Sequence, residues 1–306
     1  MIKVFGHKSP DADATCAPIS YAWFLKQKGQ EAEAFVLGEL NRETEFVLKT
    51  AGVEKPKLLE KLSEDDEVAI VDTNNPEELP DGINEASVKT IIDHHKLGGL
   101  KTESPVEIYM KPVGCSSTLV YQIMKENDIT PSKEIATLLL SAILSDTLKF
   151  TSPTTTEDDT NAADTLAGIC GLDMEKHSGA MFTAKSDLAG MSARDILMMD
   201  SKVFDFGGKK VRISVLETTK PENAKAKANE IKGEMEKVKS EEKLDAAYFF
   251  VVDIIKSSGE LFAGTDEEQK FAESAFGSSF IGGYMNLPGV VSRKKQIVPA
   301  FEKVIS

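Results

Sequence analysis

Short apolar runs alternate with segments of helical periodicity through the first half of the chain, and this alternation restricts the folds open to it. Residues 2–5, 67–73 and 88–95 read IKVF, EVAIVDT and VKTIIDHH, and apolar runs of this length are typical of buried strands. Helical patterns separate the runs, as at 15–28, where Gly29 marks the end. Strands that alternate with helices predict an α/β domain with a mostly parallel sheet flanked by helices. Further strands are predicted at 34–37 and 106–110, and further helices at 43–50, 114–128, 132–147 and 155–171.

A second pattern begins near residue 188 and predicts a smaller C-terminal α/β domain. A chain of 306 residues is long enough for two ordinary domains, which usually run to about 100–150 residues each. We expect a first domain at 1–188, a linker at 189–195 and a second domain at 196–306. In the second domain the sequence predicts strands at 209–217, 246–255 and 260–264, helices at 221–240 and 267–276, and a mobile glycine-rich loop at 277–289.

Charge and composition argue against several classes of protein. The 36 basic and 50 acidic residues give a formal charge of −14, which disfavours broad electrostatic binding to nucleic acid or to an anionic membrane. No run of about 20 apolar residues and no secretory leader pattern is present, so we expect a soluble, cytoplasmic protein. Cys16, Cys115 and Cys170 lack CxxC spacing, and reduced thiols are therefore expected.

Acidic and histidine side chains stand where the apolar runs of the first half stop. They are His7, Asp11 and Asp13 in GHKSPDAD, Asp72 after VAIV, Asp93, His94 and His95 after TII, and Asp146 at the end of LLLSAILSD. In open α/β sheets, ligands bind outside the carboxyl ends of the strands, so side chains from separate strand ends can converge there. The sequence therefore predicts one site built from several loops.

The residue types in this set indicate a pair of divalent metal ions. Buried carboxylates need cations or protons, and the four charges of Asp11, Asp13, Asp72 and Asp146 balance two divalent cations. His7 and His94 add imidazole nitrogens, and this mixed oxygen and nitrogen set suits Mn²⁺, Co²⁺, Fe²⁺ or Mg²⁺. Two-metal hydrolysis is the chemistry that such a set supports.

Each piece has a simpler explanation when it stands alone. DAD is most often a helix cap or a solvated turn, and an aspartate at a helix end can be a solvated group. The GCSS segment at 114–117 could present backbone N–H groups to a phosphate or could be a plain helix cap. Cys115 is expected to be a quiet thiol and His177 to be structural or exposed. The joint pattern at several strand ends is what favours the metal site.

The motifs resemble those of a known superfamily in both order and spacing. GHKSPDADA, VDTNN, DHH and SDT are similar to the motifs of the DHH phosphoesterase superfamily, and the C-terminal SRKKQ resembles the signature of the manganese-dependent, family II inorganic pyrophosphatases. The resemblance spans nearly the whole chain. It implies a homodimer formed through the first domain and an active site in the cleft between the two domains.

The resemblance also implies a role for each site residue. His7, Asp11 and Asp72 would hold one metal, Asp13, Asp72, His94 and Asp146 would hold the other, and Asp72 would bridge them. His95 would face the substrate as a hydrogen-bond donor, with Asp93 orienting the histidines. Lys202, Arg293 and Lys294 match the phosphate-binding residues of the family, and Arg293 can bind a phosphate through two hydrogen bonds. His95, Asp72 and Lys202 are the expected catalytic residues.

The expected reaction is the hydrolysis of pyrophosphate to two phosphates, with two or more Mn²⁺ ions per subunit and with Co²⁺ or Mg²⁺ as substitutes. A water between two metals loses its proton more readily than bulk water and can attack phosphorus in line. The alternatives are a DHH-type phosphodiesterase for oligonucleotides or cyclic dinucleotides, a short-chain exopolyphosphatase, and a regulatory binding protein. The glycine run IGGYMNLPG lacks the histidine of the nucleotide-binding relatives, and no regulatory insertion precedes SRKKQ.

Overall fold

The first unit of the protein is built on a six-stranded sheet in which all neighbouring strands are parallel. The computed structural model describes residues 1–305 and divides into two compact units after Ala184. The strand order of the first unit is β3-β2-β1-β4-β5-β6, which confirms the predicted parallel sheet. Its strands are β1 (Ile2–Phe5), β2 (Ala32–Val36), β3 (Lys57–Leu58), β4 (Glu67–Val71), β5 (Ser87–Asp93) and β6 (Glu107–Met110).

The order of these strands creates one position where the chain reverses its direction of travel across the sheet. From β1 the chain proceeds outward to β2 and β3, and then it returns to the other side of β1 and continues through β4, β5 and β6. The carboxyl ends of β1 and β4 therefore lie side by side, with connections that lead away in opposite directions. A crevice forms at such a reversal point, and this is where open α/β sheets bind their ligands.

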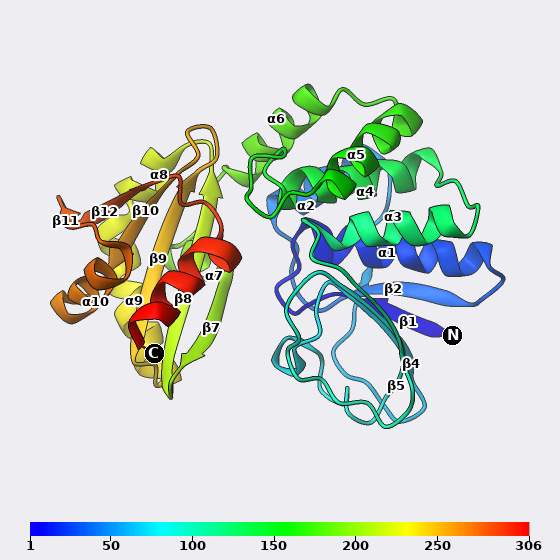
Figure 1. Cartoon of the computed structure of the whole chain (residues 1–306), viewed down its shortest axis with the longest axis horizontal. Helices are drawn as coiled ribbons and strands as arrows, with labels where there is room; N and C mark the ends of the chain where they lie inside the picture. The colour runs from blue at the N-terminus through cyan, green and yellow to red at the C-terminus, as the bar shows by residue number, and fades with distance from the viewer. Residues whose placement is uncertain (306) are drawn as a thin grey trace. The chain divides into compact units, whose positions relative to one another are not determined.

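Helices cover one face of this sheet, and loop segments cover the other. Alternate residues of a strand point to opposite faces, so Val4 packs with the helices while Phe5 packs against the loops that hold Leu62 and Leu79. Figure 1 shows α1 and α3 side by side along the helical face. The helices are α1 (Ala12–Gln27), α2 (Arg42–Ala51), α3 (Ser116–Glu126), α4 (Lys133–Asp146), α5 (Glu157–Cys170) and α6 (Met174–Lys185), with a 3-10 turn at Pro76–Glu78.

The second unit holds a mixed sheet whose strand order is β11-β12-β10-β9-β8-β7. Only the β8 and β9 pair is parallel, and the other neighbours are antiparallel. Its strands are β7 (Ser201–Phe206), β8 (Lys209–Thr218), β9 (Ala246–Asp253), β10 (Ser258–Ala263), β11 (Phe280–Ile281) and β12 (Tyr284–Pro288). Its helices are α7 (Ala193–Met198), α8 (Pro221–Ala226), α9 (Ala228–Glu242), α10 (Asp266–Phe276) and α11 (Val298–Ile305), with a π-helical turn at Arg293–Ile297. Figure 1 labels most of these elements.

Two local predictions for the second unit are wrong. The segment 277–289 contains the β11–β12 hairpin, in which Met285 and Leu287 are buried and β12 pairs with β10. Gly282 and Gly283 form its two-residue turn with positive φ angles of 65° and 92°, a conformation that suits hairpin turns and favours glycine. The helix predicted at 221–240 is interrupted at Lys227, which lies between α8 and α9.

The chain passes from the first unit to the second between Ala184 and Lys185. The predicted linker 189–195 falls within the second unit, where α7 begins at Ala193.

Among residues 1–305, no helix combines the length and the apolar character needed to cross a membrane.

Candidate metal centre

The loop after β1 brings three of the expected ligands to the reversal point of the sheet. His7 lies two residues beyond β1 and is buried. Asp11 caps α1, since its Oδ1 accepts a hydrogen bond of 2.9 Å from the N–H of Ala14. Asp13 lies in the first turn of the same helix and is completely buried. A helix N-terminus stabilises negative charge, which favours two carboxylates at this position.

Asp72 occupies an unusual backbone conformation at the end of β4. Its φ is 69°, in the left-handed region that costs a residue with a Cβ roughly 1–2 kcal/mol, although aspartate visits this region more readily than most residues. Its N–H donates to the carbonyl of Ile92 over 2.8 Å, so the pairing of β4 with β5 holds this conformation. Strained backbone is common at functional sites, where the surrounding structure holds it in place.

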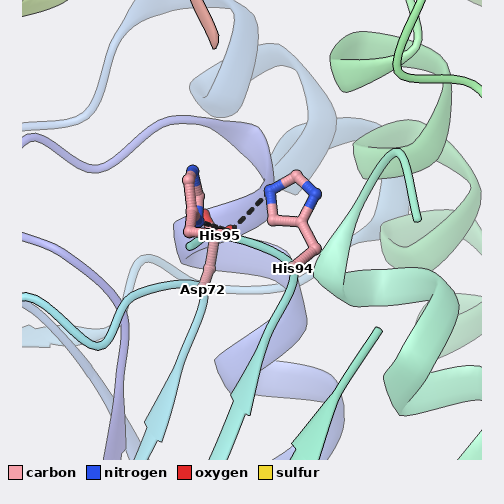
Figure 2. A group of neighbouring side chains, drawn as sticks. All are labelled: Asp72, His94 and His95. Atoms are coloured by element: carbon pink, nitrogen blue, oxygen red, sulfur yellow. Dashed lines mark ion pairs between the residues drawn. The ribbon is translucent and has the colours of Figure 1, made fainter. Parts of the chain in front are cut away.

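The two carboxylate oxygens of Asp72 face different histidines. Oδ2 lies 3.5 Å from Nε2 of His7, and Oδ1 lies 3.3 Å from Nε2 of His94 and 3.7 Å from Nδ1 of His95. Figure 2 shows Asp72 at the end of β4 together with His94 and His95, which follow β5, with dashed lines for the ion pairs. A carboxylate that faces imidazoles on both of its oxygens is placed to bridge two metal ions.

Hydrogen bonds fix the orientation of both histidine rings. Nδ1 of His94 lies 3.0 Å from the carbonyl oxygen of Val113, which can only accept, so this nitrogen carries the proton and Nε2 presents its lone pair. Nδ1 of His95 lies 2.8 Å from Oδ1 of the fully buried Asp93. The two adjacent histidines therefore differ in the atoms they can offer. His94 has Nε2 available as a metal ligand, whereas Nδ1 of His95 is held by the carboxylate of Asp93.

Asp93 is a buried acid that several donors stabilise. Burial alone would raise its pKa, but the hydrogen bond and the charge of His95, together with the hydrogen bond from Asn74, hold that pKa well below its usual range. Burial and the proximity of His94 lower the pKa of His95. Asn74 also binds the backbone at Lys96 and Gly98, which pins the loop that follows the histidines. Sequence reasoning did not identify Asn74, although its position in VDTNN beside Asp72 was a signal.

Asp13 is surrounded by neutral donors from the start of α3. Its oxygens accept hydrogen bonds from the N–H of Ser116 at 2.6 Å, the N–H of Ser117 at 3.0 Å and the hydroxyl of Ser117 at 2.6 Å. Burial and the charge of Asp72 raise the pKa of Asp13 to about 7. A divalent cation beside this carboxylate would offset both effects. The sequence left two alternatives for the GCSS segment, a phosphate-binding site or a plain helix cap. In the structure two of its backbone N–H groups donate to the carboxylate of Asp13.

Potential ligand atoms gather into three groups, and all six predicted metal ligands belong to them. Within each group the atoms lie no more than 4.8 Å apart, and the groups are His7, Asp11 and Asp72, then Asp72, His94 and His95, then Asp13, Cys115 and Asp146. Asp72 belongs to two of the groups, as expected of a bridging ligand. Oxygen and imidazole ligands dominate, which fits Mn²⁺ and similar ions.

Cys115 belongs to the group of possible ligand atoms that includes Asp13 and Asp146, although the sequence patterns did not predict a place for it there. Burial and the charges of Asp13 and Asp146 raise the pKa of the Cys115 thiol well above its ordinary value, so a neutral thiol is favoured over a thiolate. The thiol is fully buried between the start of α3 and the end of α4. His177, by contrast, is a structural residue of α6, with its Nε2 2.7 Å from the hydroxyl of Ser141.

The three basic residues expected to bind phosphate all lie in the second unit. Lys202 is half-buried in β7, and Lys294 is exposed in the π-helical turn. Arg293 binds Asp200, with Nη2 at 2.6 Å from Oδ1 and Nη1 at 3.1 Å from the backbone carbonyl. Asp200 lies two residues before Lys202, so this ion pair brings Arg293 close to the start of β7. Sequence reasoning missed Asp200, which no motif marks.

Comparisons with known proteins give one consistent result. Residues 1–143 match the model of the DHH family, N-terminal domain, and residues 179–304 match the DHHA2 domain. A probable manganese-dependent inorganic pyrophosphatase of Deinococcus radiodurans is 42% identical, covering 99% of this chain and 98% of the relative. A protein of Bacillus licheniformis with the same description is 38% identical over 99% of this chain and 98% of the relative.

Solved structures agree with the sequence comparisons. A crystal structure from Methanococcus jannaschii, assigned to the family II inorganic pyrophosphatases, has a TM-score of 0.89 and 36% identity, and it covers 100% of this chain and 99% of that chain. An exopolyphosphatase-related protein of Bacteroides fragilis has a TM-score of 0.52 and 17% identity, covering 99% of this chain and 91% of that chain. The second likeness extends to the fold alone.

Proposed function

The chain belongs to the manganese-dependent, family II inorganic pyrophosphatases, and from that membership we propose that it hydrolyses inorganic pyrophosphate to two phosphates. The observation that carries the proposal is the position of Asp72, whose two oxygens face His7 and His94 at the reversal point of the sheet. A carboxylate shared by two ligand groups would hold two metal ions close together, which suits two-metal hydrolysis.

The residues around Asp72 would hold two Mn²⁺ ions. His7, Asp11 and Asp72 form the first proposed ligand set, and Asp13, Asp72, His94 and Asp146 form the second. The ligand atoms of the first set form one group, whereas those of the second set are divided between the group of Asp72 and His94 and the group of Asp13 and Asp146. The proton on Nδ1 of His94, which leaves Nε2 for a metal, supports the place of His94 in the second set. When bound, the metal pair supplies charge neutralisation for the substrate and a lowered pKa for coordinated water.

His95 is proposed to bind the substrate through Nε2. Its Nδ1 is engaged by Asp93, so the opposite ring nitrogen is the atom that the side chain can offer to a phosphate oxygen. A hydrogen bond donated from Nε2 while Nδ1 donates to Asp93 requires the imidazolium form. Burial and His94 lower the pKa of His95 and disfavour this form, whereas the carboxylate of Asp93 and the negative charge of a bound phosphate favour it.

Lys202, Arg293 and Lys294 are proposed to bind the phosphate groups of the substrate, with Lys202 also stabilising charge in the transition state. Pyrophosphate carries up to four negative charges, and hydrolysis concentrates charge on the oxygens around the bond that breaks, where fixed cations stabilise it. Arg293 is held by Asp200, which orients its guanidinium before substrate arrives. The second unit would act as the substrate-binding domain.

Phosphate release from three substrates tests the proposed activity. Pyrophosphate, tripolyphosphate and a dinucleotide are each incubated with the full chain in Mn²⁺, in Mg²⁺ or in a chelator. We expect strong preference for pyrophosphate, higher rates with Mn²⁺ and loss of activity in chelator. Preference for tripolyphosphate or for the dinucleotide would contradict the proposal and favour an exopolyphosphatase or a phosphodiesterase.

We also propose that the enzyme works in the cytoplasm as a homodimer formed through the first unit, without a nucleic-acid or membrane partner. The edge strand β6 supports a dimer, because its Ile108 is 51% exposed at an unpaired sheet edge of the kind that proteins cover. The formal charge of −14 supports the absence of a nucleic-acid partner. Light scattering of the full chain at micromolar concentration tests the dimer, and a monomer mass would refute it.

A further inference from the structure

Asp159 is a buried carboxylate outside the metal centre that accepts four hydrogen bonds. It lies in the first turn of α5 and has no exposed surface. Two of its donors come from the start of its own helix, the N–H and the hydroxyl of Thr156, at 2.8 and 2.7 Å. The other two come from the start of α3, the N–H of Gly114 at 2.8 Å and the hydroxyl of Thr118 at 2.6 Å.

These contacts exceed what a helix cap needs. In the capping box of α7, Asp195 is exposed and binds only the N–H and the hydroxyl of its cap residue Ser192. Asp159 makes the equivalent bonds to Thr156 and adds two bonds to a segment more than 40 residues earlier in the chain. Burying a carboxylate is costly unless donors compensate it, so the extra bonds bind the start of α3 firmly to α5.

Gly114 sits against this carboxylate with no room for a side chain. A Cβ at this position would lie 2.8 Å from Oδ2 of Asp159 and 2.9 Å from Cγ2 of Thr147. Thr147 directly follows Asp146 at the end of α4. The Gly114 backbone is therefore held between the start of α5 and the end of the helix that carries an expected metal ligand.

The segment that Asp159 holds is the one that holds two metal-ligand carboxylates. Ser116 donates its N–H to Asp13 at 2.6 Å and its hydroxyl to Asp72 at 3.0 Å. Ser117 donates both its N–H and its hydroxyl to Asp13. Hydrogen bonds thus attach the start of α3 to Asp159 on one side and to the carboxylates of Asp13 and Asp72 on the other, and the backbone of residues 114–118 connects the two sets.

We propose that Asp159 is a positioning residue of the metal centre: by holding the start of α3, it sets the two serines that fix Asp13 and Asp72 in their ligand positions. This inference rests on the metal centre proposed above, but it concerns metal binding and not the choice of substrate. Partners that orient metal ligands commonly change metal affinity or activity by about 10–100-fold when they are removed. Asp159 touches none of the expected ligands, so its effect passes through the start of α3.

Two matched variants separate this role from simple helix capping. Thr118→Val removes the hydroxyl donor on the α3 side and leaves the bond from Gly114, while Thr156→Val removes the hydroxyl donor on the α5 side and leaves the bond from its own N–H, with nearly the same change of shape. Asp159→Asn removes the carboxylate itself, and Asp158→Asn removes an exposed charge from the same turn as a control. Mn²⁺ affinity is measured on the full chain by competition with a chelator and electron paramagnetic resonance, and thermal unfolding is recorded for each variant.

We expect Thr118→Val and Asp159→Asn to weaken Mn²⁺ binding by about 10-fold or more, while Thr156→Val and Asp158→Asn change it by less than about 3-fold. Amide hydrogen exchange at Ser116 and Ser117 should accelerate in the same two variants. The proposal is overturned if Thr118→Val binds Mn²⁺ as the unmodified chain does, or if Thr156→Val weakens binding as much as Thr118→Val at an equal loss of thermal stability. If Asp159→Asn does not fold, the two threonine variants decide. Substrate preference of the unmodified chain, measured separately, tests the proposed activity independently.

Discussion

Replacing Asp13 by asparagine is expected to stabilise the protein without metal and to remove most of the stabilisation that Mn²⁺ provides. Asp13 is completely buried, and its pKa is raised from 3.8 to about 7, chiefly by burial and by the charge of Asp72. The unfolded chain, where the carboxyl ionises near its ordinary pKa, therefore holds this charge at lower cost than the folded protein does.

The magnitude follows from the pKa and from the hydrogen bonds that the substitution changes. A rise from 3.8 to about 7 corresponds to about 4 kcal/mol at 1.36 kcal/mol per pKa unit, an upper figure because Asp13 and Asp72 share the effect. An asparagine oxygen can still accept both bonds from Ser117, but its amide nitrogen then faces the N–H of Ser116, which costs about 1–3 kcal/mol. The difference leaves a net stabilisation of about 1–3 kcal/mol near pH 7.

The sign of the pH dependence provides a second measurement. A raised folded pKa means that the contribution of Asp13 to stability is fully present below the unfolded pKa of about 3.8 and is lost as pH rises toward 7. The advantage of Asp13→Asn over the unmodified chain should therefore grow by about 2 kcal/mol between pH 5 and pH 7. Urea unfolding in chelator at several pH values measures it, with the exposed Asp164→Asn as a control.

Added Mn²⁺ should reverse the ranking of the two proteins. A ligand at 1,000 times its dissociation constant stabilises the folded state by about 4.1 kcal/mol, which exceeds the advantage of the variant, and the variant should gain much less because one ligand is missing. The reasoning fails if Asp13→Asn destabilises the protein in chelator at pH 7, or if Mn²⁺ raises the unfolding temperature of both proteins equally.

Three other substitutions test separate parts of the structure. Asp72→Ala should lower pyrophosphate hydrolysis by about 10³-fold or more, since both ligand sets lose a member, and retained turnover at saturating Mn²⁺ would refute the bridging assignment. Arg293→Lys should raise KM for pyrophosphate by about 10-fold without changing Mn²⁺ affinity, because lysine cannot reproduce the two-pronged hydrogen bonding of arginine, and unchanged steady-state kinetics would contradict its role. Burial lowers the pKa of His177 below its ordinary 6.5, so the stability that this residue contributes is present above that value and is lost as pH falls. His177→Gln should flatten the fall in unfolding free energy between pH 7 and pH 5, and an unchanged pH profile would show that His177 titrates normally.

The sequence predicted the parallel sheet and the residues at its edge because both depend on local patterns. Each buried strand is a continuous apolar run, and the acid or histidine that follows it marks where the strand leaves the core, as Asp72 does after β4. The parallel order then brings these ends together without further information. That the ligand groups share Asp72 follows from the same topology.

Local sequence patterns could not predict the features that depend on contacts between distant segments. The burial of Cys115 beside Asp146 results from the packing of α3 against α4, and the pairing of Arg293 with Asp200 joins residues more than 90 positions apart. The β11–β12 hairpin was missed for a different reason, since its glycines suggested a loop while the alternation of Met285 and Leu287 already indicated a strand. A positive φ at Asp72 leaves no trace in the sequence, because glycine is the residue that usually signals it.

The acidic loop after β1 places the buried negative charge of Asp13 among hydrogen-bond donors that carry no charge of their own. The donors around Asp13 are backbone N–H groups and a hydroxyl, which are neutral and fixed in direction. A basic side chain in their place would compete with a metal for the same oxygens, whereas neutral donors orient the carboxylate and leave its charge for the cation. The buried charge of Asp13 lowers the stability of the protein without metal. The same charge attracts a divalent cation and raises its affinity for the site. Metal binding therefore depends on the start of α3 as well as on the ligands, because Ser116 and Ser117 orient the carboxylate of Asp13.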